Sequence, residues 1–511
     1  MDVPEIRAMV ALQLRRLTDF QHGCRNLAVC ARVCKDWHAS FMPFLYRALS
    51  LAIPARSYFF PSFEALKANC HFVQQFYLTL SSTRNQILQY TVATVRNLTK
   101  LEVVANEDRS LGLGAIGWLS LLPLLVNNSG IKELAIGGIT HSNCLAHIAK
   151  HCTLHLTTLH LENMKFDWSE LLDVLINCRG LSKLTCYSCT VNGSKEGWKE
   201  VDITSRSATT NITDLTLQDS LGGGNVSLVD WMKVCPRLET LTVRDDSKSG
   251  LGPVSQFNPG PQLFSLELDC RLLKDTELTE VLVHCTNLKE LILKRTSVTQ
   301  QVFAALSSHF SSLTSLNLRA QVVLEQWMVG RIFEGCSRLE ELYLTEVDLN
   351  SLYNTALDDQ EDIPWACRDV LKRLCILEIQ TSADASLNER FTKRLMDLKK
   401  LEEVLTKAIY KGAGKRYTLN PGDVPGDTPE AQFLARLCEC KDTENPPKAL
   451  NSLKMSPRLR FIKNVWPRLQ YLCYLRDHDD IYSDDGDYGY VDDDYIGDDY
   501  FEDDYYGDDY Y

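Results

Sequence analysis

Apolar residues recur along this chain in a short pattern, Leu-x-x-Leu-x-Leu. In the stretch 285–298, CTNLKELILKRTSV, the three apolar positions are Leu288, Leu291 and Leu293. Leu291 and Leu293 are separated by one residue, which is the spacing of a β-strand with one buried face. Leu288 lies three residues earlier and reaches the same interior through a bend. A strand this short is not stable alone, so the pattern predicts that it pairs with copies of itself.

Copies of this pattern run through most of the chain. Most neighbouring copies are 25 or 26 residues apart, and the longest gap, 35 residues, precedes the last clear copy. The longer gaps fit loop insertions on one face of a repeat array. Weaker copies begin at Leu398 and Leu469. The first positions of the clear copies are Val73, Leu98, Ile131, Leu156, Leu181, Ile212, Leu238, Leu263, Leu288, Leu313, Leu339 and Leu374.

The segments between the predicted strands carry apolar residues at helical spacing. They predict strand–loop–helix units that build an α/β solenoid, a curved parallel sheet with the helices on its convex side. These units resemble the leucine-rich repeat, whose period is about 20–29 residues. The solenoid is predicted to span residues 73–410. The clearest helical segments are residues 169–178, 229–235, 278–285, 303–310 and 329–336.

The first fifty residues show helical periodicity without the repeat. Ile6, Val10 and Leu14 fall on one helical face, and Pro43 is predicted to end a second helix. Residues 1–50 are therefore predicted to form a small all-α module. One interpretation is a cap for the solenoid, which repeat arrays need at their ends. The second helical face is made by Leu27, Cys30 and Cys34, with Val33 and Trp37 beside it.

The residue types in this module suggest a more specific interpretation. Pro4-Glu5-Ile6, VCKDWH at 33–38 and PFLYR at 43–47 resemble the F-box, a small helical module. Val3 stands where that family has leucine, and Tyr46 where it has tryptophan. The resemblance implies that the module docks on the Skp-type adaptor of a cullin–RING (SCF-type) ubiquitin ligase. The adaptor-binding residues that it implies are Pro4, Glu5, Ile6, Val10, Leu27, Val33, Cys34, Trp37, Leu45 and Tyr46.

Residues that flank the strand leucines are predicted to point out of the concave face of the sheet. This face is the largest rigid surface that a solenoid offers. Because tyrosine and arginine often anchor interfaces, we expect a protein substrate to bind there. Together with the F-box resemblance of residues 1–50, a binding face of this kind implies a non-catalytic substrate-recognition subunit. The predicted substrate-binding residues are His160, Arg244, Ile292, Lys294, Asn317, Arg319 and Tyr343.

Two other functions fit parts of the sequence. One is a leucine-rich-repeat scaffold or inhibitor that binds a protein without a ligase. The other is a GTPase activator of the kind that joins such repeats to an acidic tail. That family has a regular asparagine after the strand; Asn106 fits this position, whereas Thr296, Gln321 and Val347 do not.

Charge is distributed unevenly along the 511 residues. The net charge is −13, but the chain after Arg476 holds 16 acidic residues and no lysine or arginine. The body is thus nearly neutral, and the Asp/Tyr-rich end is predicted to be a disordered acidic tail. The predicted divisions are a helical module (1–50), a connector (51–72), the solenoid (73–410), an irregular insertion (411–454), a terminal repeat or cap (455–476) and the tail (477–511).

Candidate chemistry is sparse. The chain has 18 cysteines and no secretory signal, which favours reduced thiols in the cytoplasm or nucleus. A single Cys186-x-x-Cys189 motif and the Gly412–Lys415 segment are weak zinc and phosphate signals. No catalytic residue, cofactor or metal site, and no nucleic-acid or membrane partner, is predicted. Four cysteines at one repeat position are predicted to fill tight corners after the helices: Cys178, Cys235, Cys285 and Cys336.

Overall fold

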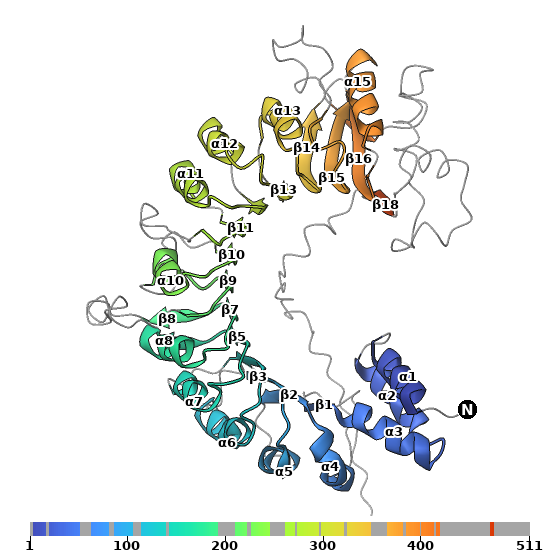
Figure 1. Ribbon diagram of the computed structural model, residues 1–511, viewed down its shortest axis with the longest axis vertical. Coiled ribbons are helices and arrows are strands. Elements are labelled where there is room, and N and C mark those ends of the chain that lie inside the picture. The colour runs from blue at the N-terminus through green and yellow to red at the C-terminus, as the bar shows by residue number, and fades with distance from the viewer. Residues whose placement is uncertain are drawn as a thin grey trace, which may run out of the picture.

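The computed structural model is an arc of β-strands backed by helices (Figure 1). The strands line the inner, concave side of the arc, and the helices lie on its outer, convex side. The structure describes residues 4–16, 20–51, 63–80, 86–105, 114–138, 143–192, 210–221, 226–245, 261–270, 273–295, 298–320, 324–348, 365–381, 385–398, 400–412, 415–418 and 471–474.

The helices and strands alternate along the arc after an opening group of three helices. The opening helices are α1 (Pro4–Arg16), α2 (Phe20–Cys30) and α3 (Lys35–Tyr46). The later helices are α4 (Phe63–Asn69), the 3-10 turn η1 (Cys70–Phe72), α5 (Gln86–Thr94), α6 (Gly114–Asn127), α7 (Cys144–His151), α8 (Trp168–Asn177), α10 (Leu228–Val234), α11 (Asp275–His284), α12 (Gln300–Ser307), α13 (Gln326–Gly335) and α15 (Ala385–Met396).

Within the described ranges, one sheet of sixteen strands runs the length of the arc. Its strands are parallel except for β17, which is antiparallel to β16. A separate small sheet pairs β6 (Lys165–Asp167) with β8 (Thr190–Asn192). The main sheet contains β1 (Ala48–Leu51), β2 (Gln75–Leu80), β3 (Lys100–Ala105), β4 (Glu133–Gly137), β5 (Thr158–Glu162), β7 (Lys183–Tyr187), β9 (Asp214–Gln218), β10 (Thr240–Arg244), β11 (Ser265–Asp269), β12 (Glu290–Lys294), β13 (Ser315–Ala320), β14 (Glu341–Asp348), β15 (Arg373–Thr381), β16 (Glu403–Gly412), β17 (Lys415–Thr418) and β18 (Tyr471–Tyr474).

The register of the sheet confirms the predicted repeat. Leu291 of β12 lies opposite Leu266 of β11 and Leu316 of β13, so equivalent triad positions stack along the arc. Leu291 and Leu293 have no exposed surface, whereas the residues between and beside them are partly exposed. The predicted convex helices are also present, because α8, α10, α11, α12 and α13 overlap the predicted segments.

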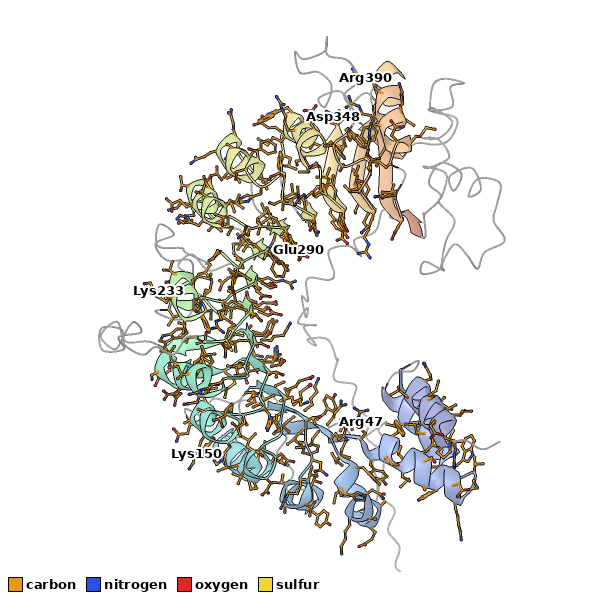
Figure 2. All side chains as sticks on the ribbon, in the orientation of Figure 1. Arg47, Lys150, Lys233, Glu290, Asp348 and Arg390 are labelled. Carbon is orange, nitrogen blue, oxygen red and sulfur yellow. The ribbon has the colours of Figure 1, made fainter. Side chains whose placement is uncertain are left out.

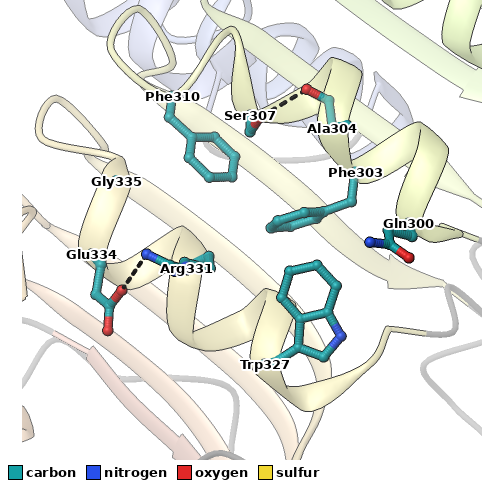
Figure 3. A pocket seen from close by; sticks show the side chains of 9 residues that line it. All are labelled: Gln300, Phe303, Ala304, Ser307, Phe310, Trp327, Arg331, Glu334 and Gly335. Carbon is teal, nitrogen blue, oxygen red and sulfur yellow. Dashed lines mark hydrogen bonds and ion pairs between the residues drawn. The ribbon is translucent and has the colours of Figure 1, made fainter. Parts of the chain in front are cut away.

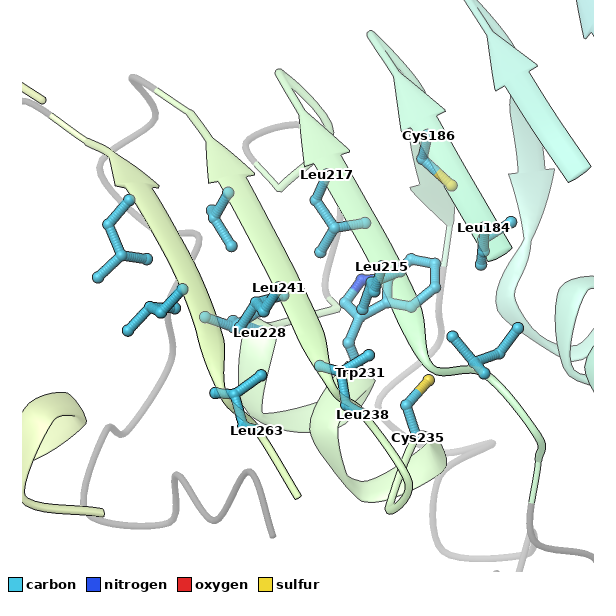
Figure 4. Close-up of a cluster of buried hydrophobic side chains, with 14 of the residues drawn as sticks. Leu184, Cys186, Leu215, Leu217, Leu228, Trp231, Cys235, Leu238, Leu241 and Leu263 are labelled. Atoms are coloured by element: carbon cyan, nitrogen blue, oxygen red, sulfur yellow. The ribbon is translucent and has the colours of Figure 1, made fainter. Parts of the chain in front are cut away.

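The core lies between the sheet and the helices, where each triad meets the helix of its own repeat. Figure 4 shows Trp231 of α10 beneath the strand leucines, with Leu215 and Leu241 beside it. The ring of Trp231 meets that of Trp168 from α8 edge-on, with their centroids 4.7 Å apart. Such contacts join neighbouring repeats into one continuous core, as a solenoid requires.

The last clear copy of the triad begins at Leu371 and not, as predicted, at Leu374. Leu374 lies opposite Leu342, the second position of its own triad, so the equivalent of Leu339 is Leu371. Leu371 is fully buried. By the same register, Leu401 rather than Leu398 occupies the first position of the next repeat. The predicted terminal copy begins at Leu469, which lies outside the described residues, and its second leucine, Leu472 of β18, lies opposite Val404 of β16.

The sheet begins earlier than predicted. Strand β1 pairs in parallel with β2, with Leu49 opposite Phe76, so the solenoid starts at Ala48 and not at residue 73. In this register Tyr46 takes the first triad position of an additional repeat, and its side chain is buried. The carbonyl oxygen of Arg47 accepts hydrogen bonds from the amides of Gln74 and Gln75. The opening helices are therefore joined to the first repeat without a spacer.

The helical module also differs in detail from its prediction. Helix α3 does not end at Pro43, as predicted, but continues through it to Tyr46. The predicted second helix is divided by a turn at residues 31–34, and Cys34 is the N-cap of α3. Cys30 and Cys34 thus do not share a helical face.

The predicted irregular insertion contains regular structure where it can be described. Of residues 411–454, the described ones belong to β16 and to β17, which form an antiparallel hairpin. Strands on both sides of the Gly412–Lys415 segment are unlike the strand-to-helix setting of a phosphate loop. The helix-prone part of the predicted connector forms α4, which follows β1 and therefore lies inside the sheet's first repeat. The predicted acidic tail, 477–511, lies outside the described residues.

A buried asparagine joins two repeats near the N-terminal end of the arc. The side-chain oxygen of Asn128 accepts the amide of Leu98 at 2.9 Å, and its nitrogen donates to the carbonyls of Val95 and Leu124. Replacing Asn128 with alanine leaves three buried backbone groups without these partners. We expect this change to lower the free energy of unfolding by about 1–3 kcal/mol in urea denaturation. A change below about 0.5 kcal/mol, as at ordinary surface positions, would contradict this account.

A buried histidine gives the fold a pH dependence. His309 is buried, its Nε2 lies 2.9 Å from the carbonyl oxygen of Leu282, and burial lowers its pKa below the ordinary value. As pH falls below about 6.5, the unfolded chain takes up a proton that the folded chain resists, so stability decreases. Between about pH 7.5 and 5.5, the thermal midpoint of the wild type should fall more than that of a His309→Gln variant. Equal falls would exclude this role for His309.

Candidate interaction surfaces

Six of the seven predicted substrate-binding residues lie on the concave face, spread over strands β5, β10, β12, β13 and β14. Along each strand the triad side chains point toward the helices, so the alternating residues point into the arc (Figure 2). Glu290 marks this inner side in Figure 2, while Lys150 and Lys233 mark the outer helices. Arg319 lies in β13, but its side chain is outside the described part of the chain. The other predicted residues are half-buried on the inner face: His160, Arg244, Ile292, Lys294, Asn317 and Tyr343.

Two of these residues share an acidic partner that the sequence analysis missed. Glu267 of β11 lies between Arg244 and Lys294, with nitrogen-to-oxygen distances of 3.0 and 3.3 Å. The next carboxylate on the same strand, Asp269, is buried and forms an ion pair with Arg295. The centre of the concave face is therefore a network of paired charges spanning β10 to β12. Only the register of the sheet could have revealed these partners, because they come from different repeats.

The opening helices form a module with its own small core. Ala11, Cys24, Leu27 and Phe41 are buried there, together with Leu45 and Tyr46. Trp37 is half-buried, and its ring stacks on that of Phe41 at 5.1 Å with an angle of 3°. Of the residues that the F-box resemblance implies for binding, Leu27, Leu45 and Tyr46 thus stabilise the interior and present no surface to a partner.

The same module exposes large apolar side chains. Ile6, Met9 and Val10 are 56%, 65% and 40% exposed, and their spacing places them on one face of α1. Val29 and Val33, at the end of α2 and in the turn after it, are also exposed. Pro4, Glu5 and Cys34 are exposed as well. Met9 and Val29 were not predicted, although their spacing from Ile6 and Val33 was a usable signal.

A hollow lies on the convex side, between α12 and α13 (Figure 3). Phe303 and Trp327 meet edge-on in its wall at 5.2 Å, and Phe310 closes one end. Arg331 and Glu334 form an ion pair at its rim. It is on the opposite face of the sheet from the predicted substrate-binding residues.

The cysteines occupy the positions predicted for apolar corner residues. Cys178, Cys235, Cys285 and Cys336 each follow a helix and are buried. Burial raises the pKa of Cys235 and Cys285 to about 12, and that of Cys178 to about 11, so these thiols are protonated and poorly reactive.

The Cys186-x-x-Cys189 motif is also inside the fold. Cys186 fills the third triad position of β7, and the sulfur of Cys189 lies 3.4 Å from the carbonyl oxygen of Leu161. Among the described residues no group of three or more His, Cys, Asp or Glu side chains could hold a metal ion. In that same part of the chain, no helix has the length and apolar character needed to cross a membrane.

Comparisons with known proteins found only distant structural likenesses. No protein-family model matches the chain, and no curated protein matches it. Among solved structures, the leucine-rich-repeat protein LIC12759 of Leptospira interrogans is 15% identical, with a TM-score of 0.33, over 78% of this chain and 89% of that one. The internalin inlF of Listeria monocytogenes is also 15% identical, with a TM-score of 0.31, over 71% and 88%.

Likeness at this level carries no argument about function. The repeat assignment rests instead on the register of the sheet, in which equivalent leucines stack from strand to strand. This chain is thus a leucine-rich-repeat solenoid, a fold suited to holding protein partners on a rigid surface.

Proposed function

We propose that this protein is the substrate-recognition subunit of an SCF-type ubiquitin ligase in the cytoplasm or nucleus. The opening helices bind the Skp-type adaptor, which brings the cullin, and the concave face binds a protein substrate. The chain itself performs no chemistry. The observation that carries the proposal is the exposure of large apolar side chains on the helical module: Ile6, Met9, Val10, Val29 and Val33.

This surface is not accounted for by a capping role. A cap buries apolar residues against the first repeat and turns polar residues to solvent. The core of the module reaches Ala65 and Phe72 beside the first strands, as a cap requires, but Ile6 and Met9 remain more than half exposed. Outside the module, the large apolar residues with such exposure in the described regions are Val126, Leu154 and Val283, which lie in or beside three different convex helices. An apolar group on one small module is typical of a protein-binding site.

The F-box resemblance names the partner of this surface. Pro4 is the first residue of α1, a position that proline favours, and Ile6 follows it on the exposed face. Trp37 contributes through packing, since its ring stacks on the buried Phe41. The contact set supported by exposure is therefore Pro4, Glu5, Ile6, Val10, Val33 and Cys34, with Met9 and Val29 added.

The experiment is to purify the tagged full chain from cells and to probe the eluate for the Skp-type adaptor and the cullin. Both should co-purify. Absence of both from an eluate of folded protein would reject the ligase proposal and favour a scaffold that binds proteins through its repeats alone.

A further inference from the structure

A hollow of about 270 Å³ interrupts the concave face over strand β4. The register of β3, β4 and β5 places three side chains of each strand in rows that cross the sheet. In the middle row Ala135 lies between Glu102 and His160, and in the next row Gly137 lies between Val104 and Glu162. The two smallest side chains thus sit at the centre, with larger ones on both sides.

The glycine shapes one wall of this hollow. A Cβ placed on Gly137 would lie 3.4 Å from the Cβ of Glu162 and 3.5 Å from its Oε2. The carboxylate of Glu162 therefore leans over β4 into space that a side chain at residue 137 would occupy. The floor beneath it is formed by Ala135 and the backbone of β4, so it offers an apolar surface beside a carboxylate.

Only some of the charged side chains that line the hollow form ion pairs. At one end Lys100 and Glu133 pair with each other at 3.4 Å. His160 lies 3.8 Å from Glu162 and is charged only when it is protonated. Glu102, on the opposite wall, forms no ion pair among the described residues. Two carboxylates, Glu102 of β3 and Glu162 of β5, thus border the apolar floor on its two sides, in neighbouring rows of the sheet.

We propose that this hollow binds an arginine side chain of the protein substrate. The inference rests on the proposed use of the concave face for substrate binding. An arginine has an apolar stem that suits the floor over Ala135 and Gly137. Its planar head presents five N–H donors in a fork, which can donate to carboxylates on two sides. Lysine carries a single compact charge and is expected to engage one wall less specifically.

The test uses the full chain labelled with ¹³C-methyl alanine, so that the methyl group of Ala135 reports from the floor. Its signal is assigned with an Ala135→Gly variant. Titration with N-acetylarginine amide should shift this signal with a Kd of about millimolar, as expected for a ligand of this size. N-acetylcitrulline amide, which has nearly the same shape without the charge, should not shift it. Equal shifts with both probes, or none with either, would overturn the proposal.

Variants of Glu102 and Glu162 test whether these two carboxylates bind the arginine probe. Glu102→Gln and Glu162→Gln should each weaken binding of the arginine probe at least about 10-fold, as expected for loss of a charge-assisted hydrogen bond. Glu290→Gln, a matched change on distant β12, should leave it unaltered. Unaltered binding in both wall variants would refute the assignment of the site.

Co-purification of the adaptor is measured in the same variants and should be unchanged, because the opening helices precede β1, which is separated from β3 by β2 in the sheet order. Arginine binding without any adaptor in the wild type would reject the ligase proposal while keeping the arginine site.

Discussion

Replacing Ile6 and Val10 together with aspartate is expected to weaken binding of the Skp-type adaptor by at least about 100-fold. Both side chains are exposed on the same face of α1, and each change would place an unpaired carboxylate in an apolar contact. The variant should keep its thermal midpoint within about 3 °C, since substitutions at exposed positions have small effects on stability. Biolayer interferometry with the purified full chain measures the binding.

The matched control replaces Val126 and Val283 with aspartate. These residues are 51% and 58% exposed on α6 and α11, so the change in charge and apolar surface is comparable but lies on the convex helices. Adaptor binding should be retained. An equal loss in the control, or full binding by the α1 variant, would show that α1 does not form the contact.

Leu291→Ala is expected to lower the free energy of unfolding by about 2–5 kcal/mol. Leu291 is fully buried between equivalent leucines of β11 and β13, so the shorter side chain leaves a cavity within three repeats. The comparison is Lys294→Ala on the same strand, which removes a partly exposed ion pair with Glu267. That change should cost within about 0.5 kcal/mol, because Glu267 keeps its ion pair with Arg244.

Urea denaturation followed by far-UV circular dichroism measures both variants. Solenoids can unfold in stages, so the transition that includes β11–β13 is the one compared. Similar losses for Leu291→Ala and Lys294→Ala would contradict the register in which leucines point to the core and their neighbours to the concave face.

The repeats were predictable because the same pattern of three apolar residues recurs many times along the chain. Each short strand must bury its triad against its own helix, and alternation then fixes which residues point into the arc. Ambiguity appears where the pattern overlaps itself. Leu371, Leu374 and Leu377 each open or continue a possible triad, and only pairing of Leu374 with Leu342 decides between them.

The ends of the solenoid were harder to predict. Tyr46, Leu49 and Leu51 form a triad, but Tyr46 also ends a helix, and helical periodicity masked its place in the sheet. Because this residue belongs to both parts, binding experiments are designed for the full chain and not for residues 1–50.

The interaction surfaces were predictable in position and not in detail. Alternation placed Arg244 and Lys294 on the concave face, but their shared partner Glu267 comes from the strand between them. The hollow over β4 exists because Ala135 and Gly137 are small and leave space beside Glu162. Such features arise from contacts between repeats and carry no signal within one repeat.

The most direct measurement is the binding of purified Skp-type adaptor to the purified full chain by isothermal titration calorimetry. The proposed function predicts one adaptor per chain with a Kd below about 1 μM, and a negative heat-capacity change from burial of apolar surface. Absence of binding at about 100 μM adaptor, with the chain folded, would contradict the proposed function.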